Sequence, residues 1–225
     1  MKQKALLVFA DPIGLDLSRR RLPRALRPLL SLRRLAAAEI AADVHLFTSG
    51  KSRATLPGFR VHEQRGATFA ERIEAATEEI ARLGYDEIVL VGSDCPGLTT
   101  ADIATAFAAL GQKRIALGPD HRGGCYLIAL RTNDRDLLRG IQWNRDSDCA
   151  QLSGRVASHD FSLLPVKQDV DSWADVRLLA RAGHHLATFV VRLLQLGKCA
   201  HDFFVDLTAH AARVRGQMPP PLLAL

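Results

Sequence analysis

Two acidic positions in this sequence have the residue types that phosphate chemistry requires. Asp94 follows the predicted strand 86–91, which ends in the apolar run 88–91, and Asp169 and Asp171 precede a helix-like stretch that opens at Ser172. Hard cations such as Mg²⁺ prefer a few carboxylates together with substrate phosphate oxygens and water. Each position also has a simpler interpretation. Asp94 could cap its own turn, and Asp169 and Asp171 could stabilise the positive end of the following helix.

An arginine-rich segment follows the first predicted strand. Its members are Arg19, Arg20, Arg21, Arg24, Arg27, Arg33 and Arg34. Guanidinium groups match phosphate oxygens in geometry, so this cluster could bind a diphosphate. It could equally form a solvated helix face or a nucleic-acid surface. No aromatic residue is interleaved with these arginines, which argues against a stacking surface for single strands. We therefore favour a small phosphorylated ligand over a polynucleotide.

The composition is that of a globular protein with one α/β domain and an appendage, or with two small domains. Of the 225 residues, 48% are hydrophobic and 24% are charged, and the net charge of +6 suits an anionic ligand. The apolar stretches are too short and too often interrupted by charge to span a bilayer. The first residues lack a cleavage site and are interpreted as a strand, so we expect a cytoplasmic protein.

The four cysteines show no pattern of a disulfide framework or a zinc site. None belongs to a Cys-x-x-Cys pair, and a chain of this length can bury a core without cross-links. We therefore expect free thiols. Cys95 has no histidine nearby in sequence, and we interpret it as structural rather than as a nucleophile.

Strand-like and helix-like segments alternate along the first 130 residues. The predicted strands are 4–10, 43–48, 59–63, 86–91, 114–117, 125–130 and 161–166. Helices are predicted over 22–42, over 100–110 and over much of 183–215. Two more are predicted from their first residues, one at the capping box Thr68 to Glu71 and one at Ser172. This alternation predicts right-handed βαβ units and a mainly parallel sheet.

Three common nucleotide or hydrolase signatures are missing. The first strand is followed by Asp-Pro-Ile-Gly at 11–14 rather than by G-x-G-x-x-G, and no G-x-x-x-x-G-K-[ST] occurs. Gly-Ser-Asp at 92–94 is not the G-x-S-x-G elbow of serine hydrolases.

Four sequence blocks, in order, resemble one bacterial family. They are Ile-Val-Leu-Val-Gly-Ser-Asp-Cys-Pro-Gly-Leu-Thr at 88–99, Ala-Leu-Gly-Pro at 116–119, Gly-Gly-Cys-Tyr-Leu-Ile-Ala-Leu at 123–130 and Asp-Val-Asp-Ser at 169–172. Over roughly 4–182 the chain is similar to glycosyltransferase-A-like proteins often labelled radical-SAM/selenodomain-associated transferases of unknown function. The block containing Asp94 is the most specific of the four.

The resemblance implies a three-layer α/β/α sandwich of the nucleotide-diphospho-sugar transferase type, with a mainly parallel mixed sheet. We expect this domain over 1–183 and a helical C-terminal extension and tail over 184–225, which could cover the site or form a homodimer surface. The resemblance also implies a site for Mg²⁺ or Mn²⁺ and a nucleotide. Its metal ligands would be Asp94 first, Asp171 second and Asp169 as a further candidate. Nucleotide contacts would come from Gly14, Arg19, Arg20, Arg21, Gln64, Gly66 and Ser93.

The chain departs from the family pattern around this site. The family's Pro-Gly-x-x-Lys-Thr-Arg-Leu loop is replaced at 13–22 by a longer stretch without lysine. Arg122 stands where an acidic residue is expected, Asp120 is displaced by two positions, and Cys125 replaces one tyrosine of a usual pair. The leading hypothesis is a metal-dependent glycosyltransferase with a nucleotide-sugar donor. The alternatives are a nucleotidyltransferase that uses a nucleoside triphosphate and a catalytically degenerate nucleotide-binding or scaffold protein.

Overall fold

The computed structural model describes residues 3–11, 17–22, 40–49, 57–185, 187–188 and 191–192. Its contacts divide the chain into two units, 1–175 and 176–225. Most of the second unit lies outside the described residues, so the helical extension predicted over 184–225 stays a prediction. The same holds for the helix predicted over 22–42. Within the part of the chain that the structure describes, no helix is both long enough and apolar enough to cross a membrane.

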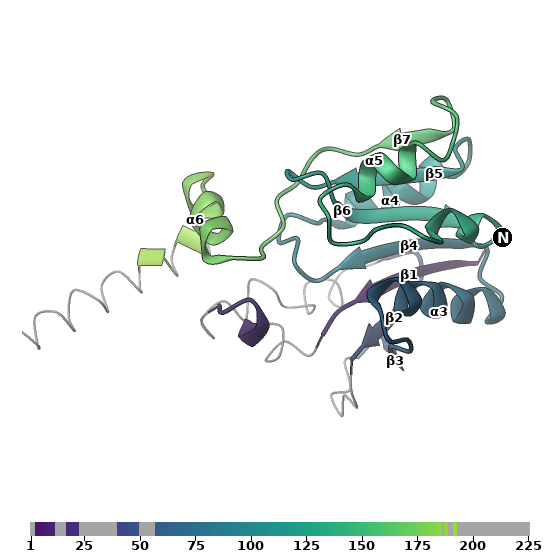
Figure 1. The fold of residues 1–225 in the computed structure, drawn as a ribbon, viewed down its shortest axis with the longest axis horizontal. Helices are drawn as coiled ribbons and strands as arrows, with labels where there is room; N and C mark the ends of the chain where they lie inside the picture. The colour runs from purple at the N-terminus through teal and green to yellow at the C-terminus, as the bar shows by residue number, and fades with distance from the viewer. Residues whose placement is uncertain are drawn as a thin grey trace, which may run out of the picture. The chain divides into compact units, whose positions relative to one another are not determined.

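The first unit is built on a seven-stranded mixed sheet (Figure 1). Its strand order is β3-β2-β1-β4-β6-β5-β7. β6 is antiparallel to both of its neighbours, and the other pairs are parallel, which confirms the predicted mainly parallel mixed sheet. The strands are β1 (Lys4–Phe9), β2 (Asp43–Thr48), β3 (Phe59–Glu63), β4 (Glu87–Gly92), β5 (Ile115–Pro119), β6 (Cys125–Arg131) and β7 (Phe161–Leu163).

Alternate side chains of the central strands supply two cores, one on each face of the sheet. In β1, Leu6 and Val8 pack with α4 (Thr100–Ala109), whereas Leu7 packs with the opposite layer. That layer contains α3 (Phe69–Arg82), the 3-10 helix η2 (Thr132–Leu138) and α5 (Asp148–Ser153). Because both faces are covered, the strands consist of nearly continuous apolar residues. This arrangement confirms the three-layer α/β/α sandwich.

Capping boxes fix the starts of the two long helices that flank the sheet. The Thr68 hydroxyl accepts from the backbone N–H of Glu71, and the Glu71 carboxylate accepts from that of Thr68, as predicted. Thr99 and Asp102 form the same arrangement at α4. The second box also sets where the turn after β4 ends, and this turn carries Asp94.

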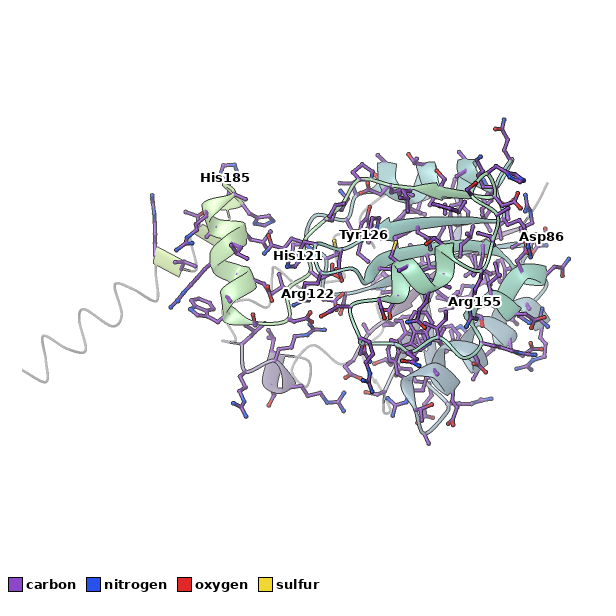
Figure 2. The ribbon with its side chains drawn as sticks, turned by 45° about the horizontal axis from the view of Figure 1, so that its top comes forward. Asp86, His121, Arg122, Tyr126, Arg155 and His185 are labelled. Atoms are coloured by element: carbon purple, nitrogen blue, oxygen red, sulfur yellow. The ribbon has the colours of Figure 1, made fainter. Side chains whose placement is uncertain are left out.

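A five-residue loop between β5 and β6 produces the one antiparallel strand of the described sheet. Gly123 in this loop has φ +109°, and a Cβ there would lie 2.4 Å from the Asp146 carbonyl oxygen, so only glycine fits. The hairpin places its loop at the same edge as the end of β4. Figure 2 shows Arg122 and Tyr126 toward this end and Asp86, which precedes β4, at the other.

Two further elements follow along the chain, of which β7 is shorter than predicted and α6 begins where predicted. β7 ends at Leu163 rather than at residue 166, because the next backbone N–H that β5 would donate to it belongs to Pro119, which has none. α6 (Trp173–Arg181) follows Ser172, as its capping pattern predicted.

A buried histidine of β2 gives the fold a dependence on pH. His45 Nδ1 lies 2.9 Å from His62 Nε2, and His62 Nδ1 lies 2.7 Å from a Glu79 oxygen. Because a carboxylate only accepts, His62 donates to Glu79 and accepts from His45, which leaves the buried His45 Nε2 without a partner. Burial, together with the nearby His62 and Arg60, lowers the pKa of His45 to about 4.

Acid should therefore destabilise the protein through His45. The unfolded chain binds a proton on this side chain near pH 6.5, whereas the folded chain does so only near pH 4. We expect the free energy of unfolding to fall by about 2–3 kcal/mol over that interval from this group. Urea unfolding across the interval measures it. His45→Asn keeps an N–H donor for His62 but cannot titrate, so equal pH dependence in the two proteins would contradict the assignment.

Candidate functional site

A cavity of about 480 Å³ lies at the sheet edge where β1 and β4 end and β6 begins. This is the edge at which open α/β sheets bind ligands, and the volume suits a small molecule. Among the residues predicted for the site, those that line the cavity are Arg19, Arg20, Gln64, Ser93, Asp94, Asp169 and Asp171. Arg21 and Gly66 are not part of its lining, and Gly14 lies outside the described residues.

Asp94 enters the cavity because of a tight approach at the end of β4. A Cβ on Gly92 would lie 2.4 Å from Asp94 Oδ1, so glycine leaves the room that this carboxylate occupies. The Asp94 carbonyl oxygen accepts from the Val170 N–H at 2.8 Å. This long-range bond helps to hold the segment containing Asp169 and Asp171 beside the end of β4.

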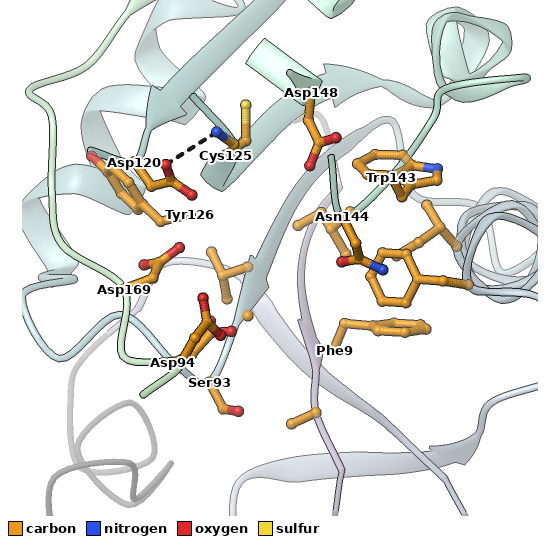
Figure 3. A pocket seen from close by; sticks show the side chains of 18 of the residues that line it. Phe9, Ser93, Asp94, Asp120, Cys125, Tyr126, Trp143, Asn144, Asp148 and Asp169 are labelled. Carbon is orange, nitrogen blue, oxygen red and sulfur yellow. Dashed lines mark hydrogen bonds between the residues drawn. The ribbon is translucent and has the colours of Figure 1, made fainter. Parts of the chain in front are cut away.

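Three carboxylates, of Asp94, Asp120 and Asp169, face one another in the cavity (Figure 3). Asp169 is only 7% exposed, and its Oδ1 has no hydrogen-bond partner among the described residues. Burial raises the pKa of Asp169 to about 7, and the charges of Asp94 and Asp120 add to this effect. A buried, unpaired oxygen among like charges is the environment that a cation would relieve.

Asp120 is held in place by the backbone of its own loop. Its Oδ1 accepts from the N–H groups of Arg122, Gly123 and Gly124 at 2.6, 2.8 and 3.0 Å. A Cβ on Gly124 would lie 2.5 Å from Asp120 Oδ2. The paired glycines therefore allow the loop to close around this carboxylate.

Arg20 joins the two acidic segments of the site. Its Nη2 lies 2.9 Å from Asp94 Oδ2, and its Nη1 donates to the Val170 carbonyl oxygen at 2.9 Å and also bonds Asp171. Arg122 bonds the other oxygen of Asp171. The structure thus brings Asp94 and Asp171 to the same guanidinium. Of the two candidates for second ligand, Asp171 is paired with arginines, whereas Asp169 faces Asp94.

Arg19 lies at the rim of the cavity. It bonds Asp11, which also accepts from the Ser49 hydroxyl, and its side chain is 56% exposed. An ion pair this exposed contributes little to stability, so Arg19 can exchange its partner for a ligand phosphate at low cost.

An aromatic row forms another wall. The rings of Phe9 and Phe69 meet edge to face with centroids 5.5 Å apart, and those of Phe69 and Trp143 do so at 5.8 Å. Gln64 is fixed nearby by donating from Nε2 to the Phe47 carbonyl oxygen at 3.0 Å. None of the three aromatic residues was predicted as part of the site, because each also fits an ordinary core pattern.

The segment 144–148 contributes polar groups that sequence reasoning missed. Asn144, Asp146 and Asp148 all line the cavity. Figure 3 shows Asn144 and Asp148. Burial raises the pKa of Asp148 to about 6, and the charges of Asp120 and Asp146 act in the same direction. The signal available in sequence was the acidic run Arg-Asp-Ser-Asp at 145–148, which alone does not distinguish a site from a solvated turn.

The described residues do not provide a complete cage for a metal. Among them, no group of three or more His, Cys, Asp or Glu side chains is arranged to hold an ion unaided. This is compatible with Mg²⁺, which usually takes one or two carboxylates and completes its shell with phosphate oxygens and water.

Comparison with known sequences identifies the family. The profile of the family described as "Uncharacterized protein conserved in bacteria (DUF2064)" matches residues 29–145, just over half of the chain. The chain belongs to this family. This assignment confirms the resemblance to a glycosyltransferase-A-like bacterial family of unknown function. No curated protein matches the sequence of the chain.

Solved structures agree with the nucleotide-diphospho-sugar transferase fold. A putative nucleotide-diphospho-sugar transferase from Desulfovibrio desulfuricans G20 is 24% identical, with a TM-score of 0.68 over 82% of this chain and 89% of that one. A CMP:2-keto-3-deoxy-manno-octonic acid synthetase complexed with CTP is 12% identical, with a TM-score of 0.53 over 79% and 97%. Rv0371c from Mycobacterium tuberculosis H37Rv, in complex with manganese, is 19% identical, with a TM-score of 0.51 over 79% and 98%. At these identities the likeness establishes the fold alone.

Proposed function

We propose that this chain is a metal-dependent transferase that takes a nucleotide-diphospho-sugar as its donor. The observation that carries the proposal is the grouping of Asp94, Asp120 and Asp169 beside Arg20 within one cavity. Carboxylates that repel one another and an adjacent guanidinium are the two partners that a metal-bound diphosphate needs.

Asp94 and Asp169 would hold Mg²⁺ or Mn²⁺. The unpartnered Oδ1 of Asp169 is the group that gains most from a cation, and Asp94 is tied to the same segment through Val170. When bound, the cation neutralises phosphate charge and makes a nucleoside diphosphate a better leaving group. Asp171 is less favoured as a ligand, because Arg20 and Arg122 already share its carboxylate.

The other cavity residues would position the donor. Arg20 would donate to phosphate oxygens, and Arg19 would do so from the rim. The base would lie against the aromatic wall beside Gln64. Hydroxyl groups of the sugar would bind to Asn144 and Asp148, whose amide and carboxyl groups can donate and accept. Positioning and electrostatics would thus supply most of the rate acceleration.

Nucleotidyl transfer from a nucleoside triphosphate is the second candidate. It is favoured by the likeness in fold to the synthetase complexed with CTP, which is a nucleoside triphosphate. The two reactions release different products. Glycosyl transfer releases a nucleoside diphosphate, whereas nucleotidyl transfer releases inorganic diphosphate.

Calorimetric titration of the full chain tests the proposal directly. We expect nucleoside diphosphates and nucleotide sugars to bind with Mg²⁺ or Mn²⁺ and to bind at least about tenfold more weakly with a chelator. Slow release of nucleoside diphosphate, with water as acceptor, would support glycosyl transfer. Release of diphosphate from a triphosphate would support the second candidate. Binding without turnover would favour a degenerate nucleotide-binding protein, and no binding of any nucleotide would exclude both enzyme hypotheses.

A further inference from the structure

Two guanidinium groups from different loops meet on one carboxylate of the cavity. Arg20, which follows β1, bonds one oxygen of Asp171, and Arg122, from the loop between β5 and β6, bonds the other. The side chains of the two arginines are only 19% and 30% exposed, whereas that of Asp171 is 43% exposed. Two partly buried guanidinium groups that together hold both oxygens of one anion have the geometry of an anion-binding subsite.

The main chain at this contact is fixed independently of the Asp171 side chain. The Asp171 N–H donates to Asp175 Oδ2 at 3.0 Å. The Arg122 N–H donates to Asp120 Oδ1 at 2.6 Å. Rotation of the Asp171 side chain alone would therefore free both guanidinium groups, while the backbone of the two loops stays in place.

The Asp171 carboxylate does not use every donor that the two arginines offer. Among the described residues, Arg122 Nε is buried and has no hydrogen-bond partner. Asp146 Oδ1 lies 4.0 Å from it, which is too far for a hydrogen bond. A diphosphate carries more acceptor oxygens and more negative charge than one carboxylate, so it can pair with guanidinium donors that a carboxylate leaves unused.

We propose that Arg20 and Arg122 form a subsite for a phosphoryl group of the donor's diphosphate, and that the Asp171 carboxylate fills this subsite until the donor displaces it. The identity of the ligand rests on the proposed function. Arg20 Nη2 also lies 2.9 Å from Asp94 Oδ2, so a phosphoryl group held here is adjacent to the carboxylate proposed to hold the cation. Arg122 thereby joins the residues that bind the donor, and Asp171 acts as an internal competitor of the diphosphate.

Titration of the full chain with inorganic diphosphate in a chelator tests the subsite apart from any metal. Asp171→Asn should bind diphosphate about fivefold more tightly than the unsubstituted chain, because an amide competes poorly for the two guanidinium groups. A gain in affinity cannot arise from damage to the fold, so it distinguishes displacement from a purely structural ion pair. The subsite is excluded if the affinity stays the same or falls, or if neither protein binds diphosphate.

Two further variants identify the cause of the gain. Asp146→Asn removes the same charge from the same cavity but breaks no hydrogen bond to Arg122, so its affinity for diphosphate should change by less than about threefold. Adding Arg122→Gln to Asp171→Asn should return the affinity to that of the unsubstituted chain or below it. An equal gain in Asp146→Asn, or a gain that persists without Arg122, would overturn the proposal.

Titration with a nucleoside diphosphate and Mn²⁺, run in parallel on the unsubstituted chain, separates this subsite from the proposed function. Metal-dependent nucleotide binding without any gain in Asp171→Asn would exclude the subsite and leave the proposed function standing. A gain for inorganic diphosphate without any nucleotide binding would support the subsite and count against the proposed function.

Discussion

Asp94→Asn should weaken metal-dependent binding of a nucleoside diphosphate or nucleotide sugar by about 100-fold or more. The amide has nearly the same shape as the carboxylate, so the close approach to Gly92 and the Val170 hydrogen bond to the Asp94 main chain are kept. What is lost is the negative charge that would hold the cation and that now pairs with Arg20 at 2.9 Å. Calorimetry with Mn²⁺, with and without nucleotide, measures the change.

Asp146→Asn is the matched control for this variant. Asp146 lines the same cavity, but its side chain is 64% exposed and is not one of the three facing carboxylates. We expect its substitution to change affinity by less than about threefold, because exposed charges interact weakly through water. If the two variants bind nucleotide and metal equally well, Asp94 does not hold the metal.

The strands could be predicted because sheets covered on both faces leave a strong signal in sequence. The ranges 43–48 and 59–63 coincide with β2 and β3, and the run 86–91 differs from β4 by one residue at each end. The place of β6 could not be predicted in the same way. Its composition fits a parallel strand equally well. Only the short loop 120–124 indicates an antiparallel hairpin, because parallel strands need a longer connection.

Short helices were missed for a related reason. α5 has six residues, of which only Leu152 is buried, so it shows no helical periodicity to detect. η2 follows β6 directly and likewise has only Thr132 and Leu138 buried. The omission of α5 mattered for the site, because Asp148 belongs to it.

Within the site, the limit of sequence reasoning is the direction of a side chain. The end of a buried strand was enough to single out Asp94. Asp169 and Asp171 stand two residues apart, and spacing alone cannot tell which of them faces Asp94. That choice depends on contacts between distant segments, namely the hydrogen bond from Val170 to Asp94 and the two arginines on Asp171.

Asp169→Asn should stabilise the metal-free chain while it removes most of the metal binding. Asp169 is buried, its Oδ1 has no partner among the described residues, and Asp94 and Asp120 repel its charge. An amide removes this repulsion and can donate an N–H to a neighbouring carboxylate, so we expect a gain of about 1–2 kcal/mol in the free energy of unfolding near neutral pH. Affinity for Mn²⁺ with nucleotide should fall by roughly 100-fold. Urea unfolding in a chelator and calorimetry measure the two effects.

Asp171→Asn decides between the two candidate ligands. Unlike Asp169→Asn, it should lower stability and leave metal affinity nearly unchanged. Its carboxylate is 43% exposed and binds Arg20 and Arg122, so its loss should cost at most about 1 kcal/mol of stability and leave metal affinity within a few-fold of the unsubstituted chain. If Asp171→Asn abolishes metal binding and Asp169→Asn retains it, Asp171 is the second ligand, and the arginines must release it when the cation binds. If Asp169→Asn instead raises the free energy of unfolding and lowers the affinity for metal, the chain keeps a destabilising carboxylate at position 169 because the cation needs it.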